Sequence, residues 1–247
     1  FAVNLSRAID RQGAPEYRDP VLFFQRTHLT RTLKSLIVDV LRTLRGDTGL
    51  NSIIHLQTNF GGGKTHAELA LYHLLTSSSE VIQFEPLVQL LIDNGIDSIP
   101  SAAVAVLPCA DLFAGGRETP DGLTLHTLWG ELAYRLGSVQ HSGADLYEIV
   151  RDADEQRTSP GAVILRKLLN AAGANLILID ELLHYIDKAA AIRVGDSNLG
   201  TQTLGFLREL TEAVEAVDHS VLVASVTASN IEDLQVLTED TAQSTLA

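Results

Sequence analysis

A glycine-rich stretch at residues 58–66, Thr-Asn-Phe-Gly-Gly-Gly-Lys-Thr-His, has the residue types of a phosphate-binding loop. An apolar run precedes it at residues 53–56, and a helix-like run follows at residues 67–75. A glycine turn between a strand and a helix directs backbone N–H groups and the positive end of the helix toward an anion. Lys64 would contact the β- and γ-phosphates, and the Thr65 hydroxyl would hold Mg²⁺. The predicted nucleotide-binding residues are Asn59, Phe60, Gly61, Gly62, Gly63, Lys64, Thr65 and His66.

One residue of this loop departs from the usual pattern. Phosphate loops of this kind begin with glycine, and this chain has Thr58 at that place. The position mainly shapes the entry to the turn, whereas residues 61–63 lie where the backbone approaches the phosphates. The competing interpretation of the loop taken alone is an accidental glycine-rich turn.

A second stretch places two acids at the end of an apolar strand. Four consecutive aliphatic residues at 176–179 predict a strand buried on both faces, and Asp180 and Glu181 follow directly. Nucleotide hydrolysis needs a phosphate cradle, a metal ion and a group that orients the attacking water. Asp180 would hold Mg²⁺ through its water shell, and Glu181 would act as the general base or position the water. The pair alone is equally typical of a helix cap, but its occurrence after the glycine loop favours a nucleotide site.

A third, weaker signal lies at the end of a strand predicted at residues 220–226. Thr227 follows that strand and would face the γ-phosphate, with Ser225 on the same face and Asn230 further along the turn. A solvated polar loop explains these residues equally well. The predicted catalytic residues are Glu181, Lys64 and Thr227, and the predicted Mg²⁺ ligands are Thr65 and Asp180.

The elements that must position these residues alternate along the chain. Strands are predicted at 52–57, 102–107, 175–179 and 220–226, separated by amphipathic helices such as 33–44 and 124–137. Such alternation predicts an α/β fold, a three-layer α-β-α sandwich with a mainly parallel sheet. Outside this frame we predict a solvated face or loop at the charged residues 151–158 and a mobile loop at 186–203. His66 and His73 are predicted to lie on a helix surface, and Cys109 to be an inert core residue.

Composition limits the partners of the chain. Its 247 residues carry a formal charge of −13, which excludes nucleic-acid binding through a broad basic face. DNA would have to be bound by other regions or subunits. No apolar run approaches the ~20 residues that span a bilayer, and one cysteine fits a reducing compartment, so we expect a cytoplasmic protein without a membrane partner. The chain starts with Phe1 and lacks methionine, as expected for a fragment or for a sequence from which residues are missing.

The two stretches resemble the Walker A and Walker B elements of P-loop NTPases of the AAA+ type. More narrowly, the chain is similar to the domain-of-unknown-function 499 family of bacterial and archaeal ATPases, in which Thr58 is the expected residue. The resemblance rests on LQTNFGGGKTH (56–66), LWGELA (128–133), LIDEL (178–182) and LRELTEAV (207–214).

This resemblance implies ATP and Mg²⁺ as cofactors and a longer protein that acts with protein partners in a DNA-associated, anti-phage defence complex. Residues 1–45 would be a helical lead-in packed on the core, 46–235 the P-loop ATPase core, and 236–247 the start of a truncated C-terminal region. We identify no arginine finger, and Arg208 is predicted to lie on the surface.

The sequence also allows other functions, and it allows the protein to form oligomers. The first alternative function is a nucleotide-binding switch or scaffold with negligible turnover that recruits partners. A GTPase is disfavoured because the chain lacks an Asn-Lys-x-Asp motif. A small-molecule kinase is disfavoured because Glu181 supplies a water activator that kinases do not need at this place.

Overall fold

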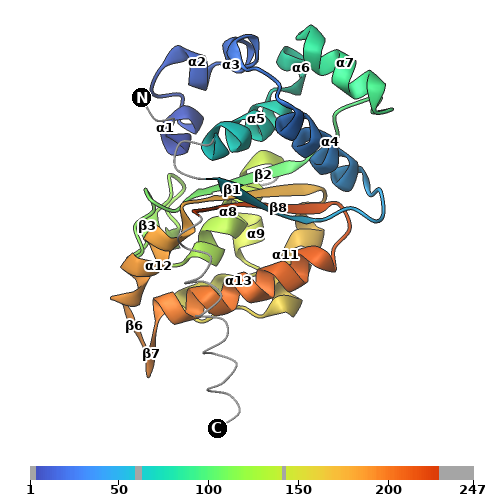
Figure 1. Ribbon diagram of the computed structural model, residues 1–247. Helices are drawn as coiled ribbons and strands as arrows, with labels where there is room; N and C mark the ends of the chain where they lie inside the picture. Colours follow the sequence, from blue (N-terminus) through green and yellow to red (C-terminus); the bar gives the residue numbers. More distant parts are fainter. Residues whose placement is uncertain (1–3, 59–62, 141–142, 228–247) are drawn as a thin grey trace.

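Four parallel strands form the central sheet of the protein, whose computed structural model describes residues 4–58, 63–140 and 143–227 (Figure 1). The strands lie side by side in the order β1-β8-β5-β2. Helices cover both faces, so the predicted α/β three-layer sandwich is confirmed. The four strands are β1 (Ile53–Thr58), β2 (Ala103–Pro108), β5 (Asn175–Asp180) and β8 (Ser220–Thr227).

The aliphatic runs form these strands because both of their faces are covered. Every residue of β5 is buried, and alternate side chains of a strand point to opposite faces of the sheet. Ile177 and Ile179 belong to one hydrophobic cluster, whereas Leu176 and Leu178 belong to another. A strand that is buried on both faces therefore needs a continuous apolar run. A strand with one solvated face would instead alternate polar and apolar residues.

One face of the sheet is covered by the helices of the first part of the chain (Figure 1). Among them, α4 follows the predicted apolar stripe closely, with Thr30 as its N-cap and Gly46 as its left-handed C-cap. Its buried residues join those of α5 and the sheet in one cluster. The helices are α1 (Leu5–Ile9), α2 (Pro15–Arg18), α3 (Pro20–Arg26), α4 (Arg31–Arg45), α5 (Lys64–Thr76), α6 (Ser78–Val81) and α7 (Glu85–Asp93).

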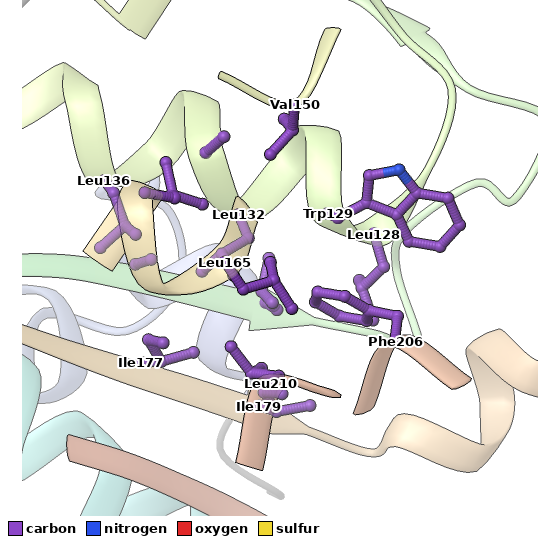
Figure 2. Close-up of a cluster of buried hydrophobic side chains, with 14 of the residues drawn as sticks. Leu128, Trp129, Leu132, Leu136, Val150, Leu165, Ile177, Ile179, Phe206 and Leu210 are labelled. Carbon is purple, nitrogen blue, oxygen red and sulfur yellow. The ribbon is translucent and has the colours of Figure 1, made fainter. Parts of the chain in front are cut away.

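The opposite face is covered by helices of the second part of the chain. Figure 2 shows side chains of this cluster, in which the rings of Trp129 and Phe206 lie 5.5 Å apart and Ile177 and Ile179 contribute from the sheet. The helices are α8 (Leu128–Gln140), α9 (Gly143–Tyr147), α10 (Arg151–Gln156), α11 (Ala162–Ala172), α12 (Leu182–Ala190) and α13 (Leu199–Glu215). Two small hairpins complete the fold, β3 (Arg117–Glu118) with β4 (Thr124–Leu125) and β6 (Arg193–Val194) with β7 (Ser197–Asn198).

The prediction of a mobile loop at 186–203 is wrong. The segment 186–203 contains the end of α12, the β6–β7 hairpin and the start of α13, whose N-cap is Asn198. The polar residues that indicated a loop form the hairpin turn and the cap. The charged segment 151–158 holds α10, in which Asp154 is fully buried by hydrogen-bonding partners from elsewhere in the chain.

The fold also shows the surroundings of Cys109 and the length and polarity of the helices. Cys109 is fully buried, and burial raises the pKa of its thiol, as expected for an inert core cysteine. In the described part of the chain, no helix is both long enough and apolar enough to cross a membrane.

Candidate functional site

The four strands of the sheet point the same way, so their carboxyl ends share one edge. At this edge β1 leads to the glycine loop, and β5 ends at Asp180. The middle strand β8 lies between them, with Thr58 opposite Thr227 and Ile179 opposite Ala224. Ligands of open parallel sheets bind at this edge. The topology thus brings the two predicted stretches together although they are far apart in sequence.

The helix α5 begins immediately after the loop. Gly63 is its N-cap with φ of +82°, a left-handed conformation in which a side chain would be strained. No side chain caps this helix end, and its first turn carries no acidic residue. The helix end therefore presents backbone N–H groups and a positive dipole, with no acidic residue in its own first turn. Asn59, Phe60, Gly61 and Gly62 lie outside the described residues.

Thr65 and Asp180, the predicted metal ligands, are brought together across the sheet edge. Thr65 Oγ1 lies 3.5 Å from Asp180 Oδ2, and Asp180 is buried. The hydroxyl of Ser225 on β8 donates to the other carboxylate oxygen, Oδ1. The carboxylate of Asp180 is therefore held between the first turn of α5 and the neighbouring strand, with one oxygen facing each.

Glu181 differs sharply from its neighbour. Its side chain is exposed, and its backbone adopts a left-handed conformation with φ of +52°. The backbone N–H of Glu181 donates to Ser225 Oγ at 3.3 Å. A left-handed non-glycine residue is uncommon and is found where surrounding contacts enforce it, often at functional sites. The strand thus ends abruptly, so that one acid is buried and the next is accessible.

Ser225 is the residue of β8 that the structure places against Asp180. The sequence favoured Thr227 over Ser225 as the residue that faces the γ-phosphate, because Thr227 stands at the end of the strand. Thr227 ends β8, and its side chain and Asn230 lie outside the described part of the chain. The signal for Ser225 was its two-residue spacing from Thr227, which places both on one face of a strand.

His66 lies in the first turn of α5 and is attached to the segment that precedes α4. Its Nε2 atom lies 3.0 Å from Thr27 Oγ1, and the Thr27 hydroxyl donates to Phe23 O at 2.7 Å. Because that hydroxyl has one proton, His66 must donate through Nε2–H. Burial lowers the pKa of His66, which favours the neutral ring.

The prediction that His66 and His73 lie on a helix surface is wrong. His73 is buried, and its Nε2 lies 2.8 Å from Tyr17 O. The ring of Phe23 packs against both histidines, at centroid distances of 4.5 and 5.2 Å. The short helices of residues 5–26 cover this side of α5.

Sequence reasoning missed Glu68, which lies one turn after Lys64 on α5. It is fully buried, and within the described residues neither of its carboxyl oxygens has a hydrogen-bond partner. Burial and then the negative charges of Asp180 and Glu181 raise the pKa of Glu68 well above its ordinary value, and Lys64 offsets part of this effect. The available signal was a single acid inside the otherwise apolar run of the helix.

A cavity of about 710 Å³ lies beside the first turn of α5. His28 and Thr30 line it from the segment before α4, Asp39 from α4 itself, and Lys64 and His66 from α5. Its wall is otherwise largely apolar, with leucine and isoleucine side chains of α4 and β1. This size and mixture of side chains are typical of small-molecule sites. A ligand at the helix end would have room to extend into it.

Arg208 takes no part in this arrangement. Its side chain is 80% exposed on α13, and Nε lies 3.7 Å from a carboxylate oxygen of Glu212 in the same helix. The prediction of a surface residue is therefore confirmed.

The DUF499 N-terminal domain matches residues 1–241. No curated protein and no solved structure matches the chain.

Proposed function

The chain belongs to the DUF499 N-terminal domain family, and from this premise we propose that it is the ATP-binding, Mg²⁺-dependent ATPase core of a larger protein. The observation that carries the proposal is the approach of Thr65 Oγ1 to Asp180 Oδ2 at 3.5 Å. A hydroxyl at the start of a helix and a buried carboxylate at the end of a parallel strand are the protein ligands that P-loop enzymes offer to Mg²⁺.

Each residue of the site has a role in this proposal. The backbone at the start of α5 and the ammonium of Lys64 would bind the phosphates. Thr65 would contact the metal directly, and Asp180 would hold its water shell. The exposed Glu181 would orient and deprotonate the attacking water. Mg²⁺ would supply charge neutralisation at the phosphate oxygens.

The strand order supports the same proposal. The strand β8 separates β1 from β5, so the glycine loop and the acids are not on adjacent strands. A polar residue of the intervening strand, Ser225, then lies between the phosphate-binding helix and the acid pair. Such a residue is well placed to respond to what occupies the site.

The cavity beside Lys64 is where we propose that the nucleoside binds. It opens at the same helix end and offers His28, Thr30 and Asp39 as polar contacts within an apolar wall. A purine ring would bury its apolar faces there and bond its edge to a few of these groups. Adenine is our choice because the chain lacks a guanine-reading motif.

We further propose that hydrolysis serves a DNA-associated, anti-phage defence complex with protein partners. This part of the proposal rests on the family resemblance. The formal charge of −13 supports assigning DNA contact to other regions or subunits.

The nucleotide site is tested by Lys64→Ala, with thermal stabilisation by ATP and Mg²⁺ as the measurement. We expect the stabilisation to disappear, since a ligand that no longer binds cannot shift unfolding. Arg208→Ala removes one positive charge from an exposed position and is the matched control, which should retain full stabilisation. Stabilisation that survives Lys64→Ala would refute the site.

Turnover is tested separately by Glu181→Gln in the intact protein. We expect nucleotide binding to persist and phosphate release to fall at least about 100-fold, the scale of a lost general base. The alternative of a scaffold with negligible turnover is supported if phosphate release is equal in the wild type and the variant.

A further inference from the structure

The carboxyl group of Glu68 is the least explained polar group of the site. It lies on α5 four residues after Lys64, so that both residues share one face of the helix. It is fully buried, and no donor among the described residues reaches either oxygen. A buried carboxyl without partners costs free energy, and such groups call for an explanation.

The Ser225 hydroxyl is close enough to lower the pKa of Glu68, but its proton is donated elsewhere. Ser225 has a single proton, which it donates to Asp180, and it accepts the N–H of Glu181. The charges nearby are also unfavourable, because Glu68 interacts electrostatically with Asp180 and Glu181 and with one cation, Lys64. The negative charges of Asp180 and Glu181, only partly offset by Lys64, disfavour ionisation of Glu68, and the oxygens of Glu68 are left without donors.

A hydrated divalent cation would compensate both the unfavourable negative charges and the missing hydrogen-bond donors. Its charge would balance these negative charges, and its bound waters would be donors to buried oxygens. Within the described residues, no three carboxylate, histidine or cysteine side chains are grouped to hold a metal directly. Glu68 is therefore suited to contact the water shell of a cation, and not to be one of a set of direct ligands.

We propose that Glu68 is a metal-positioning residue, which accepts from waters of the Mg²⁺ that Thr65 and Asp180 hold and thereby sets the Mg²⁺ requirement of nucleotide binding. This inference rests on the proposed function and adds to it a third carboxyl group, contributed by the phosphate-binding helix itself. It also gives a reason for the burial of an acid that weakens the empty protein.

The test uses Glu68→Gln and Glu68→Leu in the intact protein, with ATP and Mg²⁺ as the probes. The concentration of Mg²⁺ that gives half of the ATP-dependent thermal stabilisation should rise at least about tenfold in both variants, as for other lost outer-shell partners. Without ligand, Glu68→Leu should have a Tm higher by roughly 2–4 °C, because an unsatisfied carboxyl is replaced by an apolar group of similar size.

Asp154→Asn is the matched control, since it alters a buried carboxylate of the opposite face. It should lower the Tm and leave the Mg²⁺ midpoint unchanged. An unchanged Mg²⁺ midpoint in both Glu68 variants would overturn the inference, as would a fall in Tm with Glu68→Leu. If the wild type shows no ATP-dependent stabilisation, or if Lys64→Ala keeps it, the proposed function itself fails, and the two failures are thereby distinguished.

Discussion

Two buried carboxylates on opposite faces of the sheet have contrasting surroundings. Asp154 on α10 accepts hydrogen bonds from His126 N, from the Thr127 hydroxyl and from Tyr147 OH. Glu68 on α5 is equally buried, and no described group donates to it. The two side chains have the same exposure and nearly the same chemistry, so burial alone does not explain their different environments.

We interpret this difference as one between a structural acid, Asp154, and the proposed metal-positioning acid, Glu68. Asp154 connects the start of α8 to α9 and α10, and every donor around it belongs to the protein. Glu68 lies one turn after Lys64 on α5, and its charged neighbours include Asp180 and Glu181. A buried charge stabilises a fold when the protein supplies its partners. A buried polar group without hydrogen-bonding partners calls for an explanation, such as a bound group that supplies the missing donors.

The largest effect on stability is expected from Asp154→Ala. The change leaves three buried donors without an acceptor, so the free energy of unfolding should fall by about 3 kcal/mol. Urea denaturation measures it, and Asp152→Ala, an exposed position two residues away in α10, is the control with little expected change. A loss below about 1 kcal/mol would remove the contrast with Glu68.

A smaller loss of folding stability, which depends on pH, is expected from Glu131→Gln on α8. Burial opposes ionisation of Glu131, but Arg135 and Arg117 outweigh it and lower its pKa. Since the folded pKa lies below the unfolded value, the stabilisation is fully present above an unfolded pKa of 4.5 and is lost as the pH falls through the folded pKa.

The variant should therefore be less stable than the wild type by about 2 kcal/mol at pH 7. This difference should shrink as the pH is lowered below the unfolded pKa. Urea midpoints at neutral and at acidic pH measure it. A stability difference that grows toward acidic pH would contradict the assignment of Glu131 as an ionised, paired carboxylate.

The smallest loss of folding stability is expected from Gly63→Ala, at the N-cap of α5. Alanine at φ of +82° is strained, so unfolding should become easier by about 1 kcal/mol. Gly205→Ala is the matched control, because Gly205 lies inside α13 without positive φ, and a Cβ there would meet only Ser159 Cβ at an ordinary contact distance of 3.9 Å. That control should stabilise the protein by up to about 1 kcal/mol. Equal effects in the two variants would show that the helix start is not strained.

Much of the fold could be predicted because its signals are local. Apolar runs such as 176–179 form strands wherever both faces of a sheet are covered, and the stripe of α4 is readable from three- and four-residue spacing. The errors fell on short elements, as in residues 186–203. Elements of so few residues are stabilised by packing and capping contacts with the rest of the chain, and therefore leave little periodic signal.

The sequence by itself determined which residues could bind phosphate and metal, because a glycine loop, Lys64, Thr65 and an acid pair after a strand are local patterns. Only the tertiary structure decided which of them meet. It placed Ser225 against Asp180, bound His66 to Thr27 and buried Glu68 without partners. Such contacts depend on strand order and on the packing of α5, and burial of a side chain is a property of the whole fold.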